Sequence, residues 1–179
     1  MIDPNEFVEV AEHLLNTIAT IYGEHGVDLP ARRYLAVGGQ GETVHDCEQV
    51  TVSFDQGYSG LPGNQAFEPV KCNSPRTGVF VVEVVRSVAS PNTPEAAPTT
   101  LVPNRLGQVT TGVGILPPEV LTEIAKKQMV DAMLLMEAGL RAGETTYTGT
   151  ITDISAGTAQ GGFQAMVMVV TTSAVSGMG

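Results

Sequence analysis

Three residues of the types that bind metal ions or form disulfides lie within one part of the sequence: His45, Cys47 and Cys72. Cysteine-based zinc sites usually show paired Cys-x₂₋₄-Cys or His-x₃₋₅-His spacings, and the sequence contains neither. Cys47 and Cys72 each precede a segment with the pattern of a strand, so the two thiols would lie close together if those strands are neighbours. Three interpretations follow: two reduced thiols, which is the usual state in the cytosol, a pair that can oxidise, and a metal site.

Glu83 is an acidic residue within an otherwise apolar segment, and Arg86 follows it closely in the same segment. We expect an ion pair near the edge of the sheet or a contact with another subunit, rather than an acid–base site. Arg105, in the loop that follows, is counted with Glu83 and Arg86 as a candidate interface residue.

Motifs for catalysis or cofactor binding do not stand out. The glycine-rich stretch at residues 38–42 lacks the Gly-Lys-Ser/Thr of a phosphate-binding loop and is followed by a strand pattern. No serine lies in a Gly-x-Ser-x-Gly elbow. We therefore predict a protein that is not an enzyme and needs no cofactor.

The composition narrows the class of partner. The 179 residues include 19 Asp and Glu against 9 Lys and Arg, a net charge of −10, which opposes binding to nucleic-acid phosphates. No apolar run approaches the ~20 residues that span a bilayer, and the acidic start of the chain is unlike a signal peptide. Only 16% of residues are charged, which favours a folded subunit that buries uncharged surface in an assembly.

The hydrophobic periodicity predicts a single α+β domain over residues 1–179, with a mostly antiparallel sheet of four to five strands and two main helices. The first helix is expected to be capped by Asp3 and to end at Gly23, and the second to start at Pro117, run to about Arg141 and end at Gly143. The apolar surface of the second helix is broad enough to predict burial on more than one side, and its methionines are expected to fill the core. The expected strands and loops are as follows: strands at 33–37, 49–54, 77–88 with both faces buried, 147–153 and 163–170, and long loops at about 55–76 and 89–114.

Three segments carry a resemblance to a known family. Residues 47–52 (CEQVTV), 60–63 (GLPG) and 72–76 (CNSPR), the last leading into the valine-rich strand, resemble tail terminator proteins of the head–tail junction in long-tailed actinobacterial phages. The resemblance extends from the first helix to the third strand. It implies a small α+β subunit that forms a hexameric ring, caps the tail tube and joins it to the head connector in the virion, after assembly in the host cytoplasm.

The expected partners are therefore further copies of the chain, the tail tube protein and the head–tail connector or stopper protein. DNA would pass through the ring without specific binding, because an acidic lumen repels phosphates. A stopper or adaptor role in the same neck is the nearest alternative. A small acidic domain that binds a ligand or metal through His45, Cys47 and Cys72 is an alternative of a different class.

Overall fold

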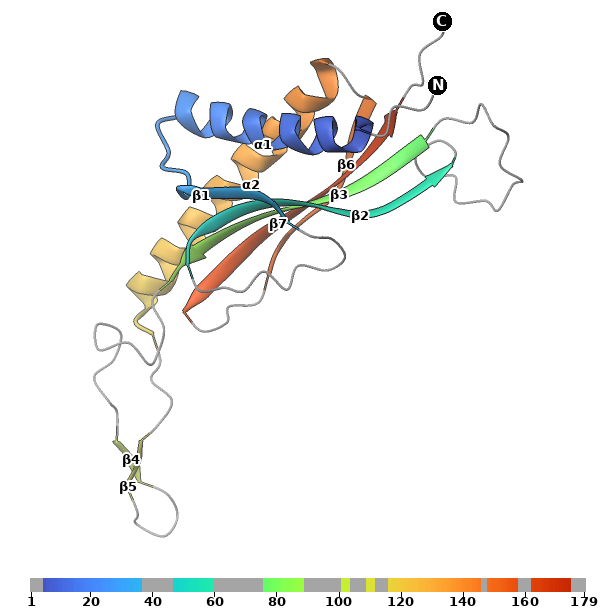
Figure 1. Cartoon of the computed structure of the whole chain (residues 1–179). Coiled ribbons are helices and arrows are strands. Elements are labelled where there is room, and N and C mark those ends of the chain that lie inside the picture. Colours follow the sequence, from blue (N-terminus) through green and yellow to red (C-terminus); the bar gives the residue numbers. More distant parts are fainter. Residues whose placement is uncertain are drawn as a thin grey trace, which may run out of the picture.

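The computed structural model describes residues 5–36, 47–59, 76–88, 101–103, 109–111, 116–145, 148–157 and 162–174. The described elements follow in the order α-β-β-β-β-β-α-β-β (Figure 1): α1 (Glu6–Glu24), β1 (Arg32–Ala36), β2 (Gln49–Ser59), β3 (Arg76–Ser87), β4 (Leu101–Pro103), β5 (Val109–Thr111), α2 (Pro118–Thr145), β6 (Thr148–Ala156) and β7 (Phe163–Ala174).

Five strands form one sheet in the order β1-β2-β3-β7-β6. Every neighbouring pair is antiparallel except β1 and β2, which run parallel. The predicted α+β fold with a mostly antiparallel sheet is confirmed, and the sheet is mixed. β4 and β5 pair only with each other and form a separate two-stranded sheet, so the segment expected to be one long loop at 89–114 contains a short hairpin.

The central position of β3 follows from its sequence. Val82 on β3 pairs with Val52 of β2 on one side and with Met168 of β7 on the other. These side chains belong to the core beneath α1 and α2, so both helices cover the same face of the sheet. On the other face Val79 and Val85 are also buried, which confirms that β3 is apolar and buried on both faces.

The first helix ends later than its glycine spacing predicts. Gly23 lies inside α1, and the helix closes at Gly26, which has a φ of 64°. The Gly26 amide donates to the Gly23 carbonyl and the Val27 amide to the Tyr22 carbonyl, the two bonds of a Schellman motif. At the other end the N-cap is Asn5, and Asp3 lies outside the described residues.

The second helix also passes the glycine that was expected to stop it. α2 continues through Gly143 to Thr145, because its glycines serve close packing against β6. A Cβ on Gly139 would lie 2.9 Å from Cδ1 of Ile151, and one on Gly143 would lie 3.3 Å from the carbonyl oxygen of Gly149. The absence of side chains at these two positions lets α2 approach the edge strand closely.

The second strand extends into the segment predicted as the loop at 55–76. The pairing of β2 with β3 shifts register between Phe54 and Gln56 and then continues to Ser59. This β-bulge breaks the alternation of apolar and polar residues on which the predicted strand end was based.

Candidate functional site

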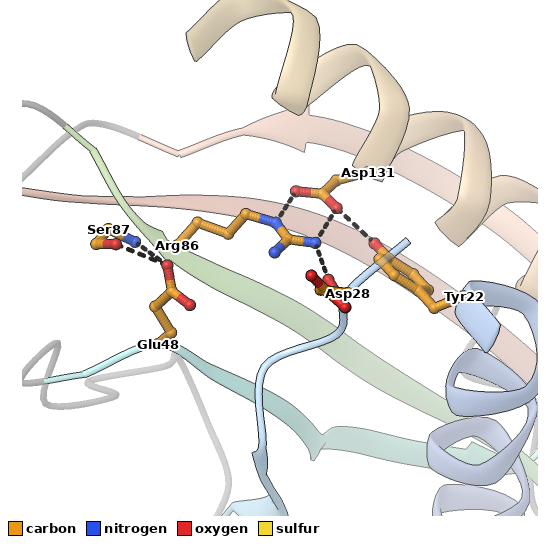
Figure 2. A network of polar contacts seen from close by, with 6 residues as sticks. All are labelled: Tyr22, Asp28, Glu48, Arg86, Ser87 and Asp131. Atoms are coloured by element: carbon orange, nitrogen blue, oxygen red, sulfur yellow. Dashed lines mark hydrogen bonds and ion pairs between the residues drawn. The ribbon is translucent and has the colours of Figure 1, made fainter. Parts of the chain in front are cut away.

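The guanidinium of Arg86 on β3 lies at the centre of a network of polar contacts (Figure 2). Its Nε donates to Oδ2 of Asp131 on α2 at 2.6 Å, and its Nη2 donates to Oδ1 of the same carboxylate at 2.8 Å. The Asp131 side chain is 5% exposed and the Arg86 side chain 18%. The two residues therefore form a bidentate ion pair largely removed from water.

Two further contacts connect this ion pair to the first helix and the turn after it (Figure 2). The buried hydroxyl of Tyr22 on α1 donates to Oδ1 of Asp131 at 2.9 Å. Arg86 Nη2 also donates to the backbone carbonyl of Asp28 at 2.9 Å. Four segments, namely α1, the turn after it, β3 and α2, thus meet at one carboxylate and one guanidinium.

The electrostatics of this cluster indicate a structural role. Burial, followed by the adjacent Asp131 carboxylate, raises the pKa of Tyr22 well above its ordinary value. The hydrogen bonds to Asp131 raise the pKa of Arg86. Because Tyr22 stays neutral and Arg86 stays charged near pH 7, neither group is suited to exchange a proton in acid–base catalysis.

A second polar contact joins β2 to β3. Oε1 of Glu48 accepts hydrogen bonds from the backbone amide of Ser87 at 3.0 Å and from its hydroxyl at 2.6 Å. The hydroxyl contact is the main reason that the pKa of Glu48 lies below its usual value. The carboxylate thereby connects the residue before β2 to the last residue of β3.

The residues singled out in the sequence are not brought together into one site by the described structure. Cys47 is a free thiol whose Sγ accepts a hydrogen bond from Nη1 of Arg32 at 3.1 Å. His45, Cys72 and Arg105 lie outside the described residues, so the thiol pair stays a prediction. Within the described ranges, no three His, Cys, Asp or Glu side chains gather as metal ligands would.

The expected ion pair between Glu83 and Arg86 does not form. Successive side chains of a strand alternate between its faces, so residues three apart point to opposite sides of β3. Arg86 instead pairs with Asp131 under the helices, while Glu83 is buried on the other face. The proposed role of both residues in an interface stays a prediction.

Sequence reasoning missed Tyr22 and Asp131, although Asp131 carried a usable signal. It precedes Leu134, Leu135 and Ala138 at helical spacing, so it belongs to the buried face of α2. A carboxylate on a buried helix face requires a charged or hydrogen-bonding partner, and Arg86 was available for that role.

An exposed apolar stripe runs along α2. Its residues are Leu121, Met129, Met133, Met136 and Leu140. The last four are three or four positions apart, which places them on one side of the helix. Met133 is 62% exposed and Leu140 59%, so none of the described residues covers this side of α2, and the methionines of the helix do not fill the core as predicted. The methionines of β7, Met166 and Met168, lie in the core.

The stripe borders a groove between α2 and β6. Its volume is about 750 Å³, and its wall includes Met136 and Leu140 from the helix and Thr150, Ile151 and Ile154 from the strand. Contiguous exposed apolar side chains beside a groove are a common feature of protein contact sites. The groove and stripe together form the candidate functional surface, here called the α2–β6 surface.

No protein-family model matches the chain, and no curated protein sequence matches it either. Among the described residues, neither helix has the combination of length and apolar character that crossing a bilayer requires. The functional assignment therefore depends on the chemistry of the surface and on the resemblance in the sequence.

Proposed function

We propose that the protein is a non-enzymatic structural subunit of a phage head–tail junction, a tail terminator that forms a ring, caps the tail tube and joins it to the head connector. The observation that carries this proposal is the β4–β5 hairpin. It consists of two three-residue strands that stand apart from the five-stranded sheet, beyond the N-terminal end of α2 (Figure 1).

An isolated two-stranded hairpin is marginally stable in water. A hairpin that projects from its own sheet gains stability when it packs against another surface, and a neighbouring subunit of a ring supplies such a surface. The exposed apolar stripe of α2 supports the same conclusion, since no part of the chain that the structure describes covers it. An assembly subunit combines both features with a low content of charged residues.

The ring is tested first by its mass. Light scattering and native mass spectrometry of the purified full chain should give a discrete oligomer, and electron microscopy should show a ring. Particles produced without the protein then separate the roles. Tails of uncontrolled length support the terminator, whereas tails of normal length that fail to join heads refute the terminator and support a stopper or adaptor. Normal particles refute both.

A variant without the β4–β5 hairpin tests whether assembly needs it. Replacing residues 101–111 with a Gly-Ser linker of equal length should preserve the far-ultraviolet circular dichroism of the five-stranded sheet and its helices. The variant should nevertheless fail to restore tail assembly in particles that lack the native protein. Full restoration by this variant would show that tail assembly does not need the β4–β5 hairpin and would refute its role in the ring.

A metal-binding role receives less support from the surroundings of Cys47. The Arg32 guanidinium next to Sγ disfavours a second cation at the same atom. Metal analysis of the purified chain tests this directly: stoichiometric zinc that is lost in the Cys47→Ser and Cys72→Ser variants would contradict the proposed function and support the metal-binding alternative.

A further inference from the structure

The two edge strands of the five-stranded sheet, β1 and β6, run in opposite directions and could pair as antiparallel strands between two copies of the chain. β6 is antiparallel to β7, and β7 is antiparallel to β3, so β6 runs in the same direction as β3. β2 is antiparallel to β3 and parallel to β1, so β1 runs in the opposite direction to β6. A rotated copy of the chain can therefore place its β1 antiparallel beside β6 while its helices stay on the same side of the sheet.

The charges of the two edges are complementary. β1 has the sequence RRYLA, with exposed Arg32 and Arg33 and no acidic residue. β6 has the sequence TGTITDISA, with exposed Asp153 and no basic residue. Arg32 pairs in register with Gln49, and Asp153 with Val169, which places both on the face of the sheet without helices.

The opposite faces of the two edges are apolar. Leu35 of β1 pairs in register with the core residue Val52, so it lies on the helix side, and it is 38% exposed. On the same side of β6, Ile151 and Ile154 form the floor of the α2–β6 groove. Leu35 of an incoming copy would thus enter the groove, and the helix α1 that packs over β1 would approach the exposed stripe of α2.

We propose that the α2–β6 surface is the docking site for the β1 edge of a second copy of this chain. Arg32 of one copy faces Asp153 of the next, and Leu35 packs under Met136 and Leu140. The contact is heterologous, because the two copies present different surfaces, and repeated contacts of this kind generate a ring when the rotation between successive copies closes. The inference rests on the proposed ring and names the surfaces that build it.

A charge exchange tests the docking directly. Arg32→Glu and Asp153→Arg should each weaken assembly about tenfold per interface, since like charges then face each other. Each variant alone should be mainly monomeric in sedimentation experiments. An equimolar mixture of the two variants should reassemble, because every contact in an alternating ring again joins opposite charges. The double variant Arg32→Glu/Asp153→Arg should assemble by itself for the same reason. A mixture that stays monomeric, with a double variant no better than the single ones, would overturn the assignment.

The apolar half of the docking site has a matched control. Leu140→Lys places a charge in the groove and should abolish assembly. Val130 is also exposed on α2, at 42%, but lies on a different side of the helix, so Val130→Lys should assemble like the native chain. Both positions are exposed, so both variants should keep the native circular dichroism and thermal midpoint.

Different results would refute the ring and the docking site. A native chain that stays monomeric at every soluble concentration overturns both the ring and the docking site. Rings that tolerate Leu140→Lys and both charge reversals leave the ring standing and refute this docking surface. A stable dimer that responds to the charge exchange refutes the heterologous contact, because a symmetric pair then uses the same residues.

Discussion

Removal of the Asp131 carboxylate should destabilise the fold more than any exposed substitution on α2. In Asp131→Ala, the Arg86 guanidinium loses the acceptor of two hydrogen bonds and keeps only the Asp28 carbonyl. The buried hydroxyl of Tyr22 loses its acceptor as well. The variant therefore leaves a largely buried positive charge without its counter-ion.

The cost of breaking a buried ion pair by deleting one partner is about 3–5 kcal/mol. Domains of ordinary stability unfold with about 5–15 kcal/mol, so the variant would lose a large share of the total. For a chain of this length, each kcal/mol lowers the thermal midpoint by about 2–4 °C, which predicts a shift of about 6–20 °C.

Urea unfolding followed by circular dichroism measures this loss. Glu123→Ala is the matched control on the same helix, since it removes an exposed ion pair with Lys126 and should stay close to the native free energy of unfolding. A double-mutant cycle with Asp131→Leu and Arg86→Met completes the test. The double variant should lose much less than the sum of the single losses, because no buried charge remains unpaired. A loss below about 1 kcal/mol for Asp131→Ala, or additive losses in the cycle, would refute the reasoning.

Three further predictions concern the pKa of Tyr22, the pKa of Glu48 and the C-terminal end of α1. Because the pKa of Tyr22 is raised, the folded state keeps the phenol proton to a higher pH than the unfolded state does. This contribution to stability is complete below about pH 10 and is lost as the pH rises further, by up to ~1.4 kcal/mol per pH unit. Alkaline unfolding curves should show this slope in the native chain and lack it in Tyr22→Phe. The lowered pKa of Glu48 acts in the opposite direction, because its contribution to stability is present above the ordinary pKa of a glutamate and is lost as the pH falls below it. Glu48→Gln should therefore destabilise the fold at pH 7, and the difference from the native chain should vanish in acid. A difference that persists in acid would exclude ionisation as the cause. Gly23→Ala should stabilise the chain by about 0.5–1 kcal/mol, because the site is helical and has space for a methyl group. Gly26→Ala should instead cost about 1–2 kcal/mol, because the residue has a positive φ. A lower thermal midpoint for Gly23→Ala than for Gly26→Ala would indicate that the helix ends at Gly23.

Local patterns predicted much of the fold correctly. The alternation of Val50, Val52 and Phe54 marked β2, and the run of valines in β3 marked a central strand. These predictions succeeded because one face or both faces of a strand must be apolar to be buried, whatever its neighbours are. The ends of elements were less well predicted. Gly143 was expected to stop α2, yet it lies where the helix needs a residue without a side chain to approach β6, and only the packed structure distinguishes the two uses of glycine.

The candidate site was harder to predict. Glu83 and Arg86 are near in sequence but lie on opposite faces of β3, and the partner of Arg86 comes from a helix 45 positions further along the chain. The exposed methionines of α2 follow the same helical spacing as the apolar residues of a buried helix face, so the sequence does not distinguish the two. Hydrophobicity indicates that a surface will be covered, but whether the same chain or another copy covers it depends on where the helix lies on the sheet.

The sequence by itself determined the α+β class, the central strand, the two helices and the acidic, charge-poor character that opposes nucleic-acid binding. All of these follow from local periodicity and composition, which act independently of distant contacts. The tertiary structure alone decided that Arg86 meets Asp131 and Tyr22, that the basic edge β1 and the acidic edge β6 run in opposite directions, and that the apolar stripe of α2 borders a groove. The physical reason is that strand order and helix placement bring together residues far apart in the chain, and those pairings set which charges are buried and which apolar surfaces stay uncovered.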